Sequence, residues 1–311
     1  MLLFKNVIKL INLSFFFSLL SFSSVRSTSL EISIIQTIDH PALNATREGF
    51  LKELSVLGYK DAHVETQSAQ GNTALAAQIA QRFVSTHPDL VLAIGTTAAQ
   101  AALSAAKGTT IPIVFASVTD PLSAKLVSNL EKPEANITGV SNFVSVEPQF
   151  ELFKKLVPEL KTIGIVYNPG EANSVAMLDK MKIAAKKLDL DLVLATASKT
   201  SDVLGASQSL CGKADALFIN NDNTSLSAFK SVVKAAQACG IPAFVSDVDL
   251  LEQGALAALG PNQFDLGRQT ARMADRILKN PGKPFPPVEF PEGTEEHINK
   301  ALKTRKLSLA P

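Results

Sequence analysis

Polar side chains gather in this sequence directly after short apolar runs, at the points where buried strands are expected to end. In an open parallel sheet, ligands bind at this edge, because the loops there meet helix N-termini with free N–H groups. The candidates with the best placement are Thr96, Thr97, Ser117, Asn168, Asn223 and Asp247, and a second set comprises Gln36, Asp39, Asn173 and Asp222.

The residue types indicate what such a site could hold. Threonine hydroxyls and helix N–H groups suit a carboxylate, whereas the side chain of Asp222 or Asp247 could hold an ammonium group. The expected ligand is therefore small and zwitterionic, such as an amino acid. Sugar sites usually contain tryptophan for stacking, and this chain has no tryptophan.

Each of these polar residues also has a purely structural interpretation as a helix cap or turn former. Capping alone explains Thr97, Ser174 and Thr224 well. It explains the run Asn220–Thr224 less well, because one cap requires only one such side chain. Six polar loops at the same edge of two facing lobes favour a cleft for a small polar ligand.

Catalytic patterns are missing from the sequence. It contains no Gly-x-Ser-x-Gly elbow, no phosphate-binding loop and no dinucleotide fingerprint. Its four histidines are isolated, without the close spacing of metal ligands, and neither cysteine has the setting of a nucleophile. The sequence therefore predicts a protein that is not an enzyme and that needs no cofactor and no metal.

The elements that must position the polar residues follow an alternating pattern. The first series has strands expected at 30–35, 63–66, 90–94 and 111–115, with helices at 41–57, 73–86 and 97–106 between them. The second series has helices expected at 147–157, 172–188 and 225–238 and strands at 162–167, 191–195, 216–219 and 242–245. Most of these strands are continuous apolar runs, which is typical of parallel sheets covered on both faces.

Two successive series predict an α/β fold of two doubly wound parallel-sheet lobes. Extended segments near 137–143 and 255–259, and one further helix at 264–279, indicate that the chain returns to the first lobe through a multi-strand hinge. We expect an N-terminal lobe of residues 28–143 plus 262–288. The C-terminal lobe would comprise residues 144–261 plus 289–311.

Residues 1–27 have the pattern of a secretory signal peptide, with Lys5 and Lys9 before a short apolar core and small residues after it. A membrane anchor is the alternative, but the apolar core is shorter than the roughly 20 residues that span a bilayer. No cysteine follows to accept a lipid anchor, so we expect a periplasmic protein. The net charge of +1, without a clustered basic surface, argues against nucleic-acid binding.

The two cysteines, Cys211 and Cys239, each follow a predicted helix and precede a predicted strand. Export would permit a disulfide between them. Two buried free thiols are an equally good interpretation, because sequence spacing does not establish the geometry of a disulfide.

Several segments together resemble one family, the ABC-transporter substrate-binding proteins of the tryptophan- and tyrosine-binding type, with the type I periplasmic binding protein fold. The segments are His40–Leu43, Arg47–Phe50, Val114–Pro121, Asn136–Ser141, Tyr167–Pro169, Asp222–Thr224 and Leu266–Gln269. The resemblance implies two lobes that close over a ligand, delivery to a membrane permease, and no catalysis, and we expect a monomer. One departure is Gly260–Phe264, where the family is expected to have a tyrosine, so the ligand could differ from the usual aromatic amino acid.

Two other classes of protein use this fold. An exported sensor would report the same kind of small ligand to a receptor and would transport nothing. A transcription regulator would carry an N-terminal helix-turn-helix, where this sequence has the signal-peptide pattern instead.

Overall fold

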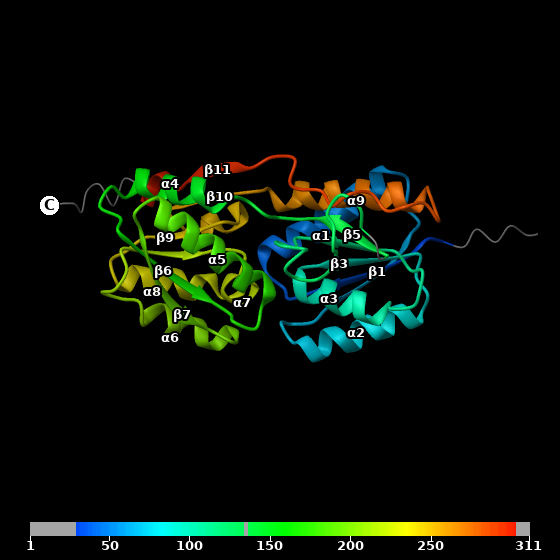
Figure 1. Cartoon of the computed structure of the whole chain (residues 1–311), viewed down its shortest axis with the longest axis horizontal. Coiled ribbons are helices and arrows are strands. Elements are labelled where there is room, and N and C mark those ends of the chain that lie inside the picture. The colour runs from blue at the N-terminus through cyan, green and yellow to red at the C-terminus, as the bar shows by residue number, and fades with distance from the viewer. Residues whose placement is uncertain (1–28, 134–135, 303–311) are drawn as a thin grey trace, which may run out of the picture.

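The computed structural model describes residues 29–133 and 136–302. The predicted signal peptide lies outside the described residues. Two α/β lobes stand side by side, each with one central sheet (Figure 1).

The first sheet has five parallel strands in the order β2-β1-β3-β4-β5. Their bounds are β1 Glu31–Gln36, β2 His63–Ser68, β3 Leu90–Ile94, β4 Ile113–Ala116 and β5 Ile137–Val140. Helices α2 (Thr73–Ser85) and α3 (Thr96–Ala105) cover one face, and α1 (Pro41–Val56) covers the other together with α9 (Gln263–Leu278). Strand β3, covered on both faces, is buried along its whole length.

The second sheet has six strands in the order β11-β10-β9-β8-β6-β7, all parallel except β11, which is antiparallel to β10. The bounds are β6 Thr162–Tyr167, β7 Asp191–Thr196, β8 Ala216–Ile219, β9 Ala243–Val245, β10 Ala257–Gly260 and β11 Glu295–Ile298. Helices α4 (Val146–Leu156) and α5 (Ala172–Lys187) pack on one face, with Phe153 stacked on Phe244 at 4.0 Å. Helices α6 (Val203–Gln208) and α8 (Phe229–Ala238) pack on the other face.

Three stretches of chain cross between the lobes: residues 141–145, residues 261–262 and the return segment 286–294 (Figure 1). The first and third are hydrogen-bonded to each other, since the amide of Ser141 donates to the carbonyl of Glu289. Gln269 holds the return segment on α9, because its Nε2 donates to the carbonyl oxygen of Phe290 at 2.9 Å. These bonds make a hinge of several strands.

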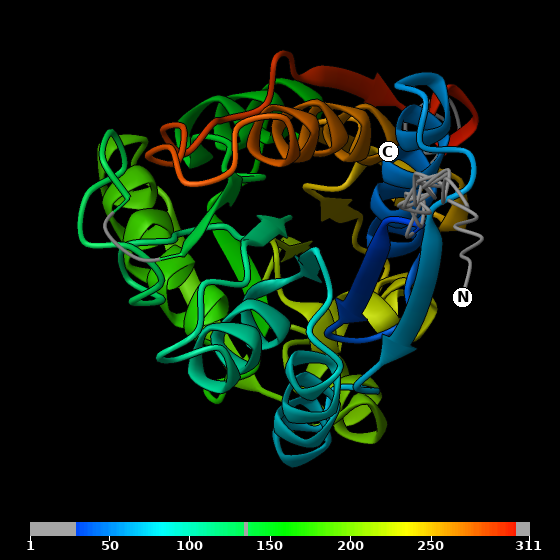
Figure 2. The same ribbon diagram turned by 90° about the vertical axis from the view of Figure 1, so that its right-hand side faces the viewer.

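Helix α9 packs against α1 of the first lobe, although strands β6 to β10 of the second sheet come between the two helices along the chain (Figure 2). Glycines permit the close approach. A Cβ at Gly267 would lie 2.0 Å from the backbone oxygen of Thr46, and one at Gly49 would lie 1.9 Å from that of Phe264. The chain therefore returns to the first lobe after β10, and β11 then carries it back to the second sheet.

Two elements differ from the sequence-based expectation. The helix expected at 225–238 is two helices, α7 (Asn223–Ser227) and α8, with a break at Ala228. Helix α7 begins earlier because Asp222 caps it by accepting a hydrogen bond from the amide of Ser225 at 2.7 Å. Strand β11 was not expected, because its Glu-Glu-His-Ile sequence has the polarity of a loop.

The structure pairs Cys211 with Cys239, whose Cα atoms are 5.4 Å apart. This disulfide joins the turn after α6 to the C-terminus of α8, on one face of the second sheet. The sequence spacing left open whether these cysteines form a disulfide or remain two buried free thiols, and the structure has the disulfide. In the described part of the chain, no helix has both the length and the apolar character needed to cross a membrane.

Candidate functional site

The carboxyl ends of the parallel strands in both lobes meet at the cleft between them. A small cavity, the inner cavity, lies there with a volume of about 10 Å³. This volume holds about one water-sized group. Both lobes and the hinge line the cavity, with His40, Ala42, Leu43, Ser117, Thr119, Asn142 and Gln263 on the first side and Asn173, Asn221, Asn223, Leu226 and Asp247 on the second.

A second space, the outer chamber, lies between the same two lobes and has a volume of about 220 Å³. Asn223 lines both spaces, so the outer chamber adjoins the inner cavity. The first lobe contributes Thr37, Ile38, Gly71, Thr73 and Thr97, and the second contributes Asn168, Gly170, Glu171, Ser198, Asn223 and Thr224.

Among the residues that the structure describes, Asp247 is the only acidic one lining the inner cavity, and it is 2% exposed. Burial and, to a smaller extent, the nearby Asp249 raise the pKa of its carboxyl to about 7, although a hydrogen bond from Gln263 partly opposes the rise. The Nε2 of Gln263 donates to Oδ1 at 2.7 Å. The Oδ2 atom accepts no hydrogen bond from any residue that the structure describes, so the ionised form of Asp247 places a largely uncompensated negative charge at the cavity.

His40 stands at the start of α1 and is buried in the cleft. Its Nε2 lies 3.3 Å from Oδ1 of Asn223, across the boundary between the lobes. Asn223 donates its own amide nitrogen to Glu171, so its oxygen accepts and the Nε2 of His40 carries the proton. Burial lowers the pKa of His40 to about 4, so the ring is neutral and its Nδ1 is an acceptor without a partner among the described residues.

Asn173, in the first turn of α5, provides a third acceptor of this kind. Its Nδ2 donates to the carbonyl oxygen of Asn221 at 2.6 Å and to Glu171 at 3.1 Å. Its Oδ1 is buried and has no hydrogen-bond partner in the described chain. Two buried acceptor atoms without a partner, from His40 and Asn173, therefore belong to residues around one water-sized cavity, and such groups are rare unless a ligand or water satisfies them. Oδ2 of Asp247, for which the described residues provide no donor, adds a third acceptor there.

A sequence profile of ABC transporter substrate binding proteins matches residues 31–304. The chain belongs to this family. A tyrosine-binding protein of Clostridioides difficile (strain R20291) is 38% identical over 284 residues, which cover 89% of this chain and 82% of the relative. The family is one of solute-binding proteins, not of enzymes.

Two solved structures of relatives show how the lobes of this substrate-binding protein are arranged. A Streptococcus pneumoniae ABC domain in complex with L-Trp superposes with a TM-score of 0.86 at 32% identity, over 90% of this chain and 95% of that chain. The ligand-free, open structure of a substrate-binding protein with adhesive properties from Clostridium difficile superposes with a TM-score of 0.67 at 37% identity, over 91% of this chain and 96% of that chain. Since the identities are similar, the difference in TM-score indicates that the lobes of this protein are arranged more like those of the L-Trp complex than like those of the open, ligand-free structure.

Two buried acids of the substrate-binding protein build the second-lobe side of the cleft. Glu171 accepts hydrogen bonds from the backbone amides of Asn223 and Thr224 at 3.0 and 2.9 Å, and from both of their side chains. Asp222 accepts from the amide of Asn168 and from the hydroxyl of Ser174, both at 2.6 Å. Burial and the neighbouring Glu171 raise the pKa of Asp222 to about 7. Both carboxylates position α7 and the Asn168 loop.

Gln263 links the two sides of the inner cavity. While its Nε2 donates to Asp247 of the second lobe, its Oε1 accepts from the hydroxyls of Ser117 and Thr46 of the first lobe, at 3.1 and 3.2 Å. Ser117 holds a left-handed backbone conformation, with φ of 54°. Such strain in a residue other than glycine is typical of functional sites.

The structure brings most of the residues proposed from sequence into the cleft. Ser117, Asn173, Asn223 and Asp247 line the inner cavity. Thr97, Asn168 and again Asn223 line the outer chamber.

The remaining proposed residues lie outside both linings. Thr96 is buried at the start of α3, with an unpartnered hydroxyl. Gln36 bonds the carbonyl of Ile38 and the side chains of Asn44 and Arg47. Asp39 pairs with Gln70 and Arg47, and Asp222 caps α7. Gln36, Asp39 and Asp222 shape loops, so capping and turn formation account for their polarity, whereas no such contact explains the hydroxyl of Thr96.

Sequence reasoning missed five polar residues of the inner cavity: His40, Thr119, Asn142, Asn221 and Gln263. His40, Thr119 and Asn221 lie in the same polar loops as proposed residues, so the signal was present but not resolved to the residue. Gln263 opens a helix that follows a hinge crossing, and no local pattern identifies it as a cleft residue.

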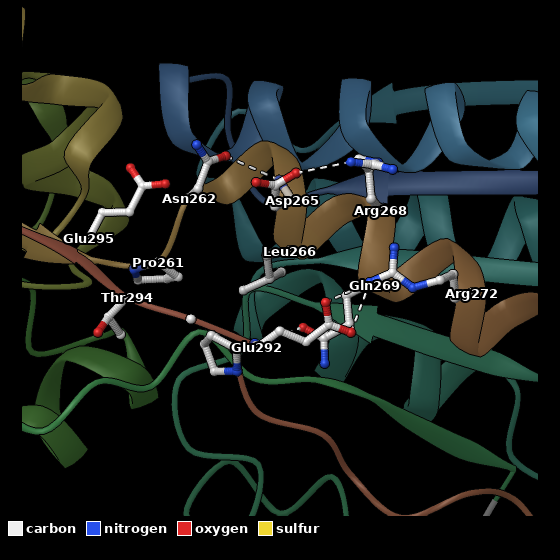
Figure 3. A pocket seen from close by; sticks show the side chains of 12 residues that line it. Pro261, Asn262, Asp265, Leu266, Arg268, Gln269, Arg272, Glu292, Thr294 and Glu295 are labelled. Atoms are coloured by element: carbon white, nitrogen blue, oxygen red, sulfur yellow. Dashed lines mark hydrogen bonds and ion pairs between the residues drawn. The ribbon is translucent and has the colours of Figure 1, made fainter.

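A separate groove of about 400 Å³ lies outside the cleft, between α9 and the return segment (Figure 3). Its two cations are already paired. Arg268 bonds Glu53 and Asp265, and Arg272 bonds Glu53 and Glu292. Neither arginine is therefore free to bind an anionic ligand, and these ion pairs hold α1, α9 and the hinge together.

Proposed function

We propose that this protein is the extracytoplasmic ligand-capturing subunit of an ABC importer, that it acts as a monomer, and that its ligand is an α-amino acid delivered to a membrane permease. The observation that carries the proposal is the set of three unpartnered acceptors at the inner cavity, from His40, Asn173 and Asp247. An ammonium group has three N–H donors and no acceptor. Its three donors equal the three acceptors in number, its positive charge complements the carboxylate of Asp247, and its size suits the inner cavity.

The electrostatics of the cavity support a cationic group. Asp247 supplies one negative charge, His40 is neutral, and no Lys or Arg lines either space in the described chain. A bound ammonium compensates the buried carboxylate, and a charge-assisted hydrogen bond is about twice as strong as a neutral one. A phosphate or another dianion would find no counterion in this cleft.

The relatives support the same class of ligand. One is named for tyrosine binding, and another was solved with L-Trp. Capture would proceed by lobe closure, since contacts to both lobes form only in the closed arrangement and shift the open–closed equilibrium toward it. The permease would recognise the closed form.

Asp247→Asn tests the proposal, because it removes the charge and keeps an oxygen for Gln263. We expect amino-acid affinity to fall more than about 30-fold, since losing one partner of a buried charge pair costs about 2–5 kcal/mol. The ligand-free variant should melt at an equal or higher temperature at pH 8, because an unpaired buried charge is gone.

The measurement is a thermal-melting screen against the twenty amino acids, with sugars and nucleosides for comparison, followed by calorimetric titration. Asp179→Asn, on the exposed face of α5, is the matched control and should bind like the wild type. A melting shift with sugars and none with amino acids would overturn the proposal, as would unchanged affinity in Asp247→Asn.

A further inference from the structure

The side chain of Gln263 joins the two lobes beside a hinge crossing. It is 1% exposed, and its Nε2 donates to Oδ1 of Asp247 in the second lobe at 2.7 Å. Its Oε1 accepts from the hydroxyls of Ser117 and Thr46 in the first lobe, at 3.1 and 3.2 Å. All four residues are buried, where hydrogen bonds are electrostatically stronger than in water. One amide thus connects the acid of the inner cavity to the first lobe.

The hinge crossing next to this amide is short. A Cβ at Gly260, the last residue of β10, would lie 1.8 Å from the carbonyl oxygen of Ser246, so Gly260 is packed against the second lobe. Asn262 is the N-cap of α9, which packs on α1 of the first lobe. Rotation of the lobes at this crossing is therefore confined to a few backbone bonds, and it moves the amide of Gln263 relative to the carboxyl of Asp247.

The bond between Gln263 and Asp247 responds to charge. Burial raises the pKa of the Asp247 carboxyl to about 7, so it is partly protonated near neutral pH without a ligand. A bound ammonium keeps the carboxyl ionised, and a charge-assisted hydrogen bond is about twice as strong as a neutral one. The polarised amide then accepts more strongly from the hydroxyls of Ser117 and Thr46, because linked hydrogen bonds strengthen one another. An ammonium in the inner cavity thereby favours the lobe arrangement in which the amide reaches both sides.

Other hydrogen bonds that join the lobes at the inner cavity lack this link to charge. His40 lies 3.3 Å from the side-chain oxygen of Asn223, and Asn221 donates to the hydroxyl of Thr119 at 3.2 Å. Both bonds join neutral side chains. They add to the stability of the closed arrangement, but their strength does not change with the ionisation of their own groups when a ligand binds.

We propose that Gln263 is a positioning residue that couples an ammonium group bound at Asp247 to closure of the lobes, by holding the crossing at 261–262 in its closed arrangement. The proposal rests on the amino-acid ligand proposed above. It assigns to Gln263 a role beyond contact with that ligand, because the amide acts on the angle between the lobes.

The first test measures closure at saturation, which separates this role from simple contact with the ligand. Gln263→Met keeps the volume and removes both hydrogen-bonding functions. The probe is L-tyrosine, or the amino acid with the largest melting shift in the screen above if that is another one. Small-angle scattering should show that the probe decreases the radius of gyration of the wild type. A saturating concentration should give less than half of that decrease in Gln263→Met.

Gln100→Met on α3 is the matched control, because Gln100 is exposed and its Nε2 donates to the carbonyl oxygen of Ala124. It should close like the wild type. Full closure of Gln263→Met at saturation would overturn the proposal, since Gln263 would then act by contact alone.

Calorimetric titration with the same probe provides the second test, a double-mutant cycle. Gln263→Met should lower the affinity of the wild type about tenfold and that of Asp247→Asn less than about threefold, because a neutral side chain at position 247 has no ligand-dependent charge to transmit. Equal losses in the two backgrounds would contradict the coupling.

Thr46→Val keeps the inference testable if Gln263→Met folds poorly. Thr46 lies outside both cavity linings, so its hydroxyl acts on the ligand only through Gln263 and Ser117. The substitution should lower the affinity of the wild type about threefold and leave that of Asp247→Asn unchanged. No effect on the wild type would exclude the coupling. If an amino acid binds and the lobes close without Gln263, only this inference fails, whereas if no amino acid binds the wild type, the proposed function itself fails.

Discussion

At the scale of single residues, Asp247 couples the protein to pH. Its pKa is raised from 3.8 to about 7 in the folded protein. The native state therefore holds this proton more tightly than the unfolded chain does, so the associated stability is present below about pH 4 and is lost as the pH rises through about 7. Asp222, whose pKa is raised to about 7 by burial and Glu171, acts on stability in the same direction.

Ligand affinity should have the opposite pH dependence. An ammonium group binds the ionised form of Asp247, so we expect amino-acid affinity to rise from pH 5 to about pH 7 and then to level off, by up to about tenfold per pH unit. Calorimetric titration at several pH values measures this. In Asp247→Asn the residual affinity should not vary with pH over this range, whereas Asp222→Asn, outside both cavity linings, should retain the wild-type slope. A flat wild-type profile would contradict a role for the Asp247 charge.

At the scale of secondary-structure elements, α1 and α9 form one unit that carries cleft residues. His40 stands at the start of α1, Thr46 lies within it, and Gln263 begins α9. The two helices can approach closely because Gly49 and Gly267 have no side chain at the contact. Salt bridges from Arg268 and Arg272 to Glu53 add to the packing. The position of the cleft groups thus depends on small residues far from the ligand.

Gly267→Ala should disturb this unit. The added Cβ would lie 2.0 Å from the oxygen of Thr46, so the helices must separate, and we expect a loss of about 1–3 kcal/mol in the free energy of unfolding and weaker ligand binding. Gly205→Ala in α6 is the control, because open space surrounds that position and alanine favours a helix by about 1 kcal/mol. Denaturant unfolding distinguishes them. Equal stability of the two variants would refute the close-packing argument.

At the scale of the whole molecule, an ion pair links the lobes in the closed arrangement. Lys180 of α5 lies 3.3 Å from Asp120, which follows β4 in the first lobe. The same ammonium lies 5.3 Å from the ring centroid of Phe143, in the first hinge crossing. The pair is partly exposed, with 39% and 15% of the two side chains accessible, so its contribution is modest.

Breaking this pair should favour the open form. Asp120→Asn or Lys180→Gln should each weaken ligand affinity about two- to fivefold, which corresponds to about 0.5–1 kcal/mol, and the double variant should lose little more than either single one. Small-angle scattering of the ligand-free variants should show a larger radius of gyration. Lys182→Gln, whose exposed partner Asp179 lies on the same helix, should change neither quantity. Additive effects of the two substitutions would show that no coupling exists.

The sequence alone determined the architecture. Continuous apolar runs such as Leu90–Ile94 mark strands buried on both faces, and their alternation with amphipathic segments leaves a doubly wound sheet as the economical arrangement. The bounds of helices were harder to predict. The helix expected at 225–238 begins at Asn223, because Asp222 caps it, and it is interrupted at Ala228. Strand β11 gave no apolar signal, since an edge strand buries little.

The tertiary structure alone decided the site. Sequence places polar loops at the ends of strands, but it does not show which side chains turn toward the cleft and which satisfy a neighbouring helix. Asp222 and Asp247 look alike in the sequence, yet one is bonded to the amides and hydroxyls around it and the other retains an oxygen without a donor. The acceptors of His40, Asn173 and Asp247 come from segments more than 70 residues apart, and only lobe closure surrounds one cavity with them. The local sequence pattern determines where helices and strands form. Which hydrogen-bonding groups from distant segments meet depends on how those helices and strands pack against one another.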